Sequence, residues 1–177
     1  MKSDTIKIDN RGNGFQAALA ETAKVAQFRG LDRKESLHLQ LCTEEMLCLA
    51  RSVTGEMEAE FWLESEDRRF ELHMSTQTVM DKEKRYYLLS SASSRKNEAA
   101  NSFLGKLRDR FEQAMTAEPD HSYDELSEDV ARDLAGFHVD DPEWDRYEQS
   151  ILRRVADEVK ISIRGGMVDM TVCKQFK

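Results

Sequence analysis

The stretch from Asp32 to Val53 constrains the fold most, because its pattern predicts a long helix with two buried sides. Asp32 and Glu35 have the spacing of a capping box at the helix start. At 100° per residue, the apolar side chains form a broad arc of Leu39, Cys42, Met46, Leu49, Ala50 and Val53, and a narrower arc of Leu37, Leu41 and Cys48. Such a helix has to pack against other elements on both arcs.

Two pairs of alternating segments supply a layer for this helix. Residues 57–64 and 70–74 alternate apolar and polar side chains around a polar turn, and residues 160–163 and 167–173 do the same around Arg164–Gly166. Alternation of this kind predicts antiparallel hairpins that bury one face. The sequence therefore predicts an α+β fold, a two-layer α/β sandwich with a mixed, mostly antiparallel sheet and helices on one face.

We expect residues 1–177 to form a single domain, since the chain has the length of one domain and shows no internal repeat. The turn residues Asn10–Gly14 and the stop at Gly30 bracket one further helix. The other expected elements are a strand at 5–8, a helix at 15–29, a short helix or ordered loop at 80–92, a helix at 97–115 with Leu107 facing inward, and a helix that packs Tyr147, Ile151 and Val155.

The negative charge is concentrated in one segment. The chain has a net charge of -8, and residues 118–145 alone carry eleven acidic residues and one basic residue. We interpret 118–145 as an acidic insertion, with a helix at 123–134, and hypothesise that it docks a protein partner. The sequence has no stripe of lysine or arginine of the kind that would indicate nucleic-acid binding.

The sequence also lacks signals for membrane insertion or secretion. No apolar run is long enough to span a membrane, and the first residues lack a signal-peptide core, so we expect a cytoplasmic protein.

The cysteines predict neither a disulfide framework nor a metal site. Cys42, Cys48 and Cys173 are odd in number and lack paired spacing, so we expect three small buried side chains in a reducing compartment. His38 and Cys42 are four residues apart, but no second pair with ligand spacing accompanies them.

One acidic residue of the long helix lies in an unusual position. Glu45 falls in a polar stripe between the two apolar arcs, where a carboxylate is costly unless it is hydrogen-bonded or has a task. Glu45 is therefore a candidate functional residue, and the alternative is a boundary residue whose carboxylate reaches water.

The segment Leu41–Ala50 resembles the N-box helix of the GHKL (histidine kinase-like) ATPase superfamily, where a glutamate precedes an asparagine by four positions. Gly165–Val172 is similar to the glycine-rich turn and closing strand of the same superfamily. Together with the order of elements, these motifs make the chain most similar, within this superfamily, to the anti-sigma-factor serine/threonine kinases. It covers nearly the whole chain except 118–145 and implies a Bergerat-type ATP-binding fold.

The resemblance also implies roles for individual residues. Glu45, or alternatively Glu44, takes the place of the catalytic base near the γ-phosphate of ATP. The asparagine that helps to hold Mg²⁺ is replaced by Leu49 in the first register and by Cys48 in the second. Neither side chain is an oxygen ligand of the kind that Mg²⁺ prefers.

The remaining nucleotide motifs are altered as well. Thr76 and Thr78 stand where the family has its adenine-binding aspartate and two glycines. Ser94, Lys96 and Asn97 stand at the phosphate lid, without its glycines. We therefore expect at most weak binding of ATP and Mg²⁺, although these seven positions are the candidate site: Glu44, Glu45, Thr76, Thr78, Ser94, Lys96 and Asn97.

Three classes of function are compatible with these residues. The first is a degenerate GHKL-type domain that acts as a regulatory protein-interaction module, similar to an anti-sigma switch, with a protein partner and the homodimer that the family allows. The second is an active ATP-binding protein or serine/threonine kinase with Glu45 as its base. The third is an unrelated small-ligand or structural domain.

Trp62 is unusual because it lies on the otherwise acidic face of the first hairpin. A tryptophan in that position marks either a contact surface for another helix or subunit, or a side chain buried under the helices or the acidic insertion.

Overall fold

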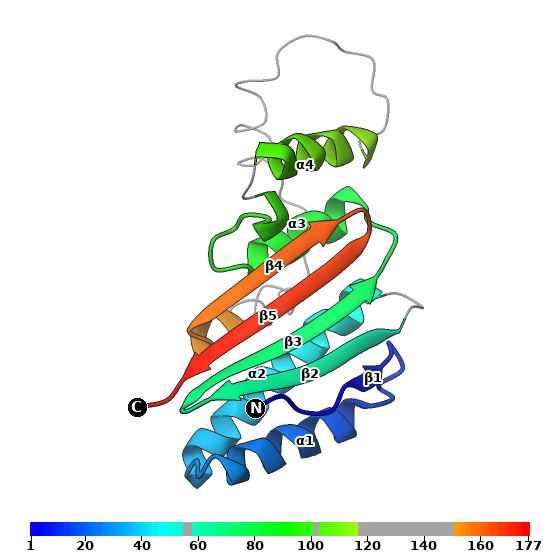
Figure 1. The fold of residues 1–177 in the computed structure, drawn as a ribbon. Helices are drawn as coiled ribbons and strands as arrows, with labels where there is room; N and C mark the ends of the chain where they lie inside the picture. The colour runs from blue at the N-terminus through cyan, green and yellow to red at the C-terminus, as the bar shows by residue number, and fades with distance from the viewer. Residues whose placement is uncertain (55–57, 101–102, 117–150) are drawn as a thin grey trace.

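The computed structural model describes residues 1–54, 58–100, 103–116 and 151–177, and Figure 1 shows their sheet with helices α1 and α2 across one face. The acidic insertion 118–145, the helix expected at 123–134 and Tyr147 lie outside the described residues. The elements are β1 (Ile6–Ile8), α1 (Phe15–Phe28), α2 (Arg33–Thr54), β2 (Ala59–Glu66), β3 (Arg69–Gln77), α3 (Lys82–Ser91), the 3-10 turn η1 (Glu98–Ala100), α4 (Phe103–Thr116), β4 (Glu158–Arg164) and β5 (Met167–Gln175).

The sheet has the strand order β1-β2-β3-β5-β4. Each neighbouring pair in the described chain is antiparallel. The predicted α+β class is therefore confirmed, whereas the sheet is antiparallel where a mixed sheet was expected. Both predicted hairpins are present, and β4 and β5 are joined by the two-residue turn Gly165–Gly166, where both residues have positive φ angles as a type I′ turn requires.

The core lies between the sheet and the helices. Alternate residues of β2, β3, β4 and β5 are buried on one face, and the intervening residues on the other face are half-buried or exposed, apart from buried Cys173. The buried face meets the broad apolar arc of α2, including Leu39, Cys42 and Met46, which are completely buried. The alternation that predicts the hairpins thus also determines which face of the sheet α2 covers.

The second buried side of α2 differs from the prediction. Leu37 is 56% exposed, and Leu41 and Cys48 are only half-buried, so the narrow arc is not a packing surface. Instead Leu47 and Thr43 are buried, and the Thr43 hydroxyl lies 3.0 Å from the Thr22 hydroxyl of α1. A hydrogen-bonded threonine pair is therefore part of the α1–α2 contact, and a projection of apolar residues does not detect such a pair.

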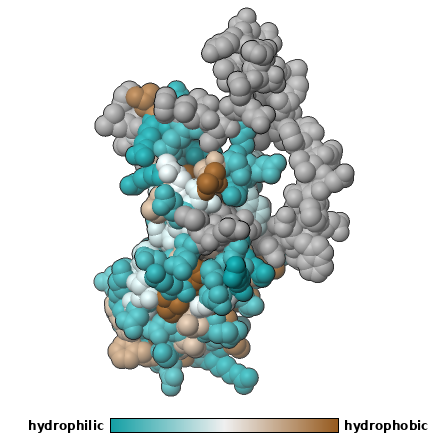
Figure 2. Space-filling view, turned by 90° about the vertical axis from the view of Figure 1, so that its right-hand side faces the viewer, coloured by the Kyte–Doolittle hydropathy of each residue, from teal (hydrophilic) through white to brown (hydrophobic). Residues whose placement is uncertain are grey.

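The predicted helix at 97–115 is interrupted. A 3-10 turn precedes α4, and Leu107 on α4 is 59% exposed rather than turned inward. Leu107 is one of a few large apolar side chains at the surface. Figure 2 shows that the visible described surface is mostly hydrophilic, with separated hydrophobic groups and no broad apolar patch.

Candidate functional site

The predicted catalytic helix is α2. Glu45 is half-buried, and its neighbour Glu44 is exposed. Leu49, which the predicted resemblance aligns with a Mg²⁺-binding asparagine when Glu45 is the base, is buried in the core with 5% of its surface exposed. The Leu49 side chain therefore packs in the hydrophobic core and supplies no oxygen ligand for Mg²⁺.

Both predicted adenine-site threonines are buried at the end of β3. The Thr76 hydroxyl donates to the carbonyl oxygen of Glu58 at 3.0 Å. The Thr78 backbone N–H donates to the carbonyl oxygen of Gly166 at 2.8 Å. The two residues thereby tie the end of β3 to the start of β2 and to the β4–β5 turn.

The predicted phosphate-lid residues do not act together. Ser94 and Lys96 are exposed, and the Ser94 hydroxyl oxygen accepts the Lys96 backbone N–H at 3.2 Å in a local turn. Asn97, by contrast, is buried with 5% of its surface exposed. The structure therefore separates Asn97 from the solvent-facing pair Ser94 and Lys96.

All four hydrogen-bonding positions of the Asn97 amide are used inside the protein. Its Oδ1 accepts the backbone N–H groups of Ile163 at 2.8 Å and Ala99 at 3.1 Å. Its Nδ2 donates to the carbonyl oxygen of Ile163 at 3.0 Å and to the Asp109 carboxylate. Asn97 thus occupies the outer edge of β4 much as a neighbouring strand would.

Ser93 closes the same edge further along β4. Its hydroxyl accepts the Val159 N–H at 2.8 Å, and its own N–H donates to the Val159 carbonyl oxygen at 2.9 Å. Unpaired edge strands invite pairing with other chains, so the segment from Ser93 to Asn97 protects β4 from this.

An ion pair that the sequence did not predict supports Asn97. Arg85 of α3 is buried and donates to the Asp109 carboxylate of α4, the same carboxylate that receives the Asn97 amide. The Arg85 Nε is buried without a hydrogen-bond partner. Arg85, Asp109 and Asn97, which we call the α3–α4 polar cluster, join two helices to the edge of the sheet. No spacing in the sequence indicates it, because its members lie far apart.

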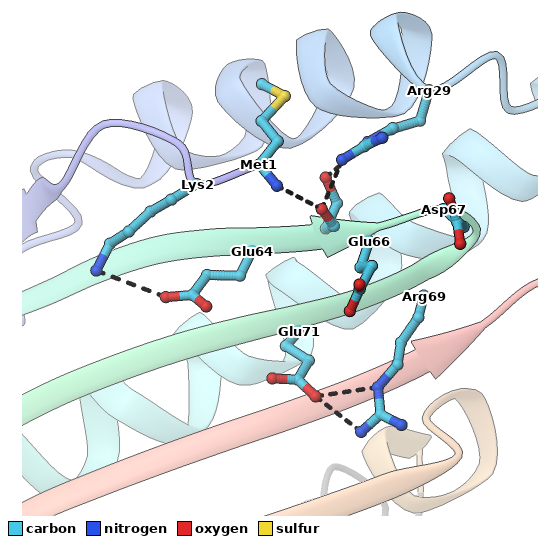
Figure 3. Close-up of a pocket in the computed structure, with 9 residues that line it drawn as sticks. Met1, Lys2, Arg29, Glu64, Glu66, Asp67, Arg69 and Glu71 are labelled. Atoms are coloured by element: carbon cyan, nitrogen blue, oxygen red, sulfur yellow. Dashed lines mark hydrogen bonds and ion pairs between the residues drawn. The ribbon is translucent and has the colours of Figure 1, made fainter.

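An open groove of about 450 Å³ lies at the other end of β2 and β3 (Figure 3). Arg29, the C-cap of α1, binds Ser65 through two hydrogen bonds, of 2.9 Å to its hydroxyl and 2.6 Å to its carbonyl oxygen. On the sheet side, Lys2 pairs with Glu64 at 3.5 Å and Arg69 pairs with Glu71 at 2.7 Å. The groove is therefore lined by charged groups that are already partly paired.

The sheet face opposite the helices carries a stacked aromatic pair beside this groove. The rings of Trp62 and His73 lie 5.1 Å apart at 11°. His73 Nδ1 is 3.1 Å from the Thr171 hydroxyl, and the Trp62 indole N–H donates to Glu64 at 3.1 Å. Trp62 is half-buried, and no described helix lies over it; the acidic insertion, the other element predicted to cover it, lies outside the described residues.

The His73 imidazole should make the fold sensitive to mild acid. Burial lowers the pKa of His73, with nearby Glu64 and Glu71 acting in the opposite direction. A histidine pKa below its unfolded value near 6.5 means that stability is complete above that pH and is lost as pH falls towards the folded pKa. The loss is at most about 1.4 kcal/mol per pH unit.

Urea unfolding of the wild type and of His73→Gln at pH 7.5 and 5.5 measures this effect. The wild type should lose more stability than His73→Gln over this interval, because contributions from other titrating groups cancel in the difference. Equal losses in the two proteins would show that His73 is not the responsible group.

The described residues show neither a metal cluster nor a membrane-spanning helix. Within them, no three histidine, cysteine, aspartate or glutamate side chains converge to form a metal site. His38 contacts the Val155 carbonyl oxygen at 2.8 Å, and burial raises the pKa of Cys42 to about 12. Cys42 and Cys173 are buried as predicted, whereas Cys48 is half-buried. No helix in the described ranges is long and apolar enough to cross a bilayer.

No protein-family model matches the chain, and a search of curated proteins finds no match. Its resemblance to the GHKL superfamily is therefore a prediction from its own residues.

Proposed function

We propose that this chain is a regulatory protein-binding domain, built on a GHKL-type scaffold, that does not turn over nucleotide. The observation that carries the proposal is the Asn97 amide, whose four hydrogen-bonding positions all serve the protein itself. A side chain used in this way at the expected phosphate lid stabilises the edge of the sheet and is not free to hold a phosphate.

Two further positions support the same function. Leu49 is a buried apolar residue where a Mg²⁺ ligand is required, and the Thr76 hydroxyl already donates to a backbone carbonyl oxygen. A hydroxyl that donates internally has to break that bond before it can donate to adenine. The regulatory role, a protein partner and a homodimer are parts of this proposal, as is a cytoplasmic location, which the three free cysteines favour.

An active ATP-binding protein or serine/threonine kinase is the second candidate. The observation that favours it is the half-buried position of Glu45 on α2, together with exposed Ser94 and Lys96. In such an enzyme the Glu45 carboxylate would accept a proton from the attacking hydroxyl or water.

Calorimetric titration with Mg·ATP and with ADP separates the two candidates. We expect no binding heat at millimolar nucleotide. Micromolar binding, about -8 kcal/mol, would contradict the proposal. If binding did occur, the rate of ATP hydrolysis or phosphoryl transfer should fall in Glu45→Gln and stay unchanged in Glu44→Gln, because only Glu45 is turned partly into the fold. The reverse result would identify Glu44 as the base.

A further inference from the structure

On the sheet face opposite helices α1 and α2, two aromatic rings and two carboxylates lie together at the corners of a square. Trp62 is directly opposite His73, and Glu64 is directly opposite Glu71, across the β2–β3 pair. Since alternate residues of a strand share a face, all four side chains project from the same side of the sheet. Directly opposed residues lie about 5 Å apart and the next row is within about 7 Å. We call these four residues the aromatic–acidic square.

The aromatic half of the square is held in place before any partner binds. The Trp62 and His73 rings are nearly parallel, and Thr171 on β5 contacts the His73 imidazole. The indole N–H of Trp62 is fixed by Glu64. A flat aromatic surface with fixed rings loses little conformational freedom when it receives another planar group.

The acidic half requires a positive charge. Two carboxylates directly opposite each other on neighbouring strands repel one another, which destabilises a sheet unless cations compensate. Lys2 compensates Glu64 and Arg69 compensates Glu71, but the side chains of this quartet are between 31% and 57% exposed. The pKa of Glu64 is lowered by the hydrogen bond from Trp62, so its carboxylate is charged at neutral pH. Both carboxylates are thus accessible to a cation from solvent.

Lys2 shows how a cation fits the square. Its ammonium lies 4.7 Å from the centre of the Trp62 ring and 3.5 Å from the Glu64 carboxylate. The Lys2 ammonium therefore combines a cation–π contact with an ion pair, and exposed contacts of both kinds are weak enough to be exchanged. Lys2 occupies the position that a cation from another protein would take.

We propose that the aromatic–acidic square binds an arginine side chain of a protein partner, which displaces Lys2. Arginine suits the site better than lysine because its planar guanidinium stacks on aromatic rings and donates to two carboxylate oxygens at once. The inference rests on the proposed function of a protein-binding domain and names the surface and the chemistry of its partner.

The adjoining groove adds charge complementarity. Figure 3 shows Glu66 near Glu64 and Glu71, and Asp67 farther along at the turn of the hairpin. Neither Glu66 nor Asp67 has an ion pair within the part of the chain that the structure describes. These two carboxylates extend the acidic character of the square along the groove, so a partner segment with a second basic residue beside its arginine is favoured.

The fluorescence of Trp62 reports binding directly. The chain has two tryptophans, so Trp144→Phe leaves Trp62 as the single one. In that background we would titrate a blocked hexa-arginine peptide and, separately, hexa-lysine. We expect saturable quenching by hexa-arginine, with at least about threefold weaker binding of hexa-lysine.

Matched variants separate the square from general charge attraction. Lys2→Ala should strengthen hexa-arginine binding about two- to fivefold, and Glu64→Gln should weaken it by a similar factor. Lys24→Ala on α1 and Glu83→Gln on α3 change the net charge equally but lie outside the square, so they should change the affinity less than about twofold. Circular dichroism of each variant verifies that it is folded.

Three outcomes would overturn the inference. They are an absence of Trp62 quenching, equal effects of Lys2→Ala and Lys24→Ala, or equal effects of Glu64→Gln and Glu83→Gln. A nucleotide titration of the same samples tests the proposed function separately. ATP binding would contradict the proposed function, whether or not the peptide binds. If neither ATP nor hexa-arginine binds, only the arginine site is overturned and the proposed function stands.

Discussion

Asp109→Ala is expected to lower the free energy of unfolding by about 3–5 kcal/mol, because it leaves the buried Arg85 guanidinium without its counter-ion. The Arg85 side chain is only 9% exposed and that of Asp109 only 15%. The substitution also removes the acceptor of the Asn97 amide, so the group that closes the edge of β4 loses part of its support. Urea unfolding monitored by circular dichroism measures the loss.

A double substitution distinguishes an uncompensated charge from lost packing. Arg85→Leu with Asp109→Leu removes both charges and keeps apolar volume, so it should recover at least half of the stability that Asp109→Ala loses. Glu58→Ala, which breaks the exposed pair with Lys7, is the control and should cost less than about 1 kcal/mol. A loss of that small size for Asp109→Ala would mean that the cluster does not stabilise the fold.

The parts of the fold predicted from sequence are those encoded by near neighbours. The Glu35 N–H donates to the Asp32 carboxylate at 2.8 Å, and the Asp32 N–H donates to the Glu35 carboxylate at 3.0 Å, which is the predicted capping box. Gly30 has a φ of +69° just after the end of α1. Each signal involves residues within a few positions, and tertiary contacts did not override them.

The candidate site was harder to predict because its contacts join distant residues. Asn97 was expected at a solvent-facing lid, but 66 residues separate it from Ile163, whose backbone it binds. The contact of His73 with Thr171 spans 98 residues. A sequence pattern can show which face of a strand is buried, but the register that sets Trp62 against His73 depends on how the hairpin pairs.

Gly14→Ala should be among the most damaging single substitutions in the described chain, at about 2–5 kcal/mol, because conformational strain and a steric clash add at this position. Gly14 is the N-cap of α1 and has a φ of +82°, a left-handed conformation that costs an L-residue about 1–2 kcal/mol. A Cβ at this position would lie 2.1 Å from the Lys7 carbonyl oxygen, so the backbone of β1 would have to move. That displacement adds about 1–3 kcal/mol, as overpacking does elsewhere.

Gly12→Ala provides the matched comparison, because Gly12 has a φ of +87° and a Cβ at this position would meet no atom within 4 Å. Its cost should be the conformational part alone, about 1–2 kcal/mol. The difference between the two variants in urea unfolding therefore measures the contact of the α1 start with β1. Equal costs would mean that this contact relaxes freely, and that the position of α1 on the sheet does not depend on the close approach of Gly14 to Lys7.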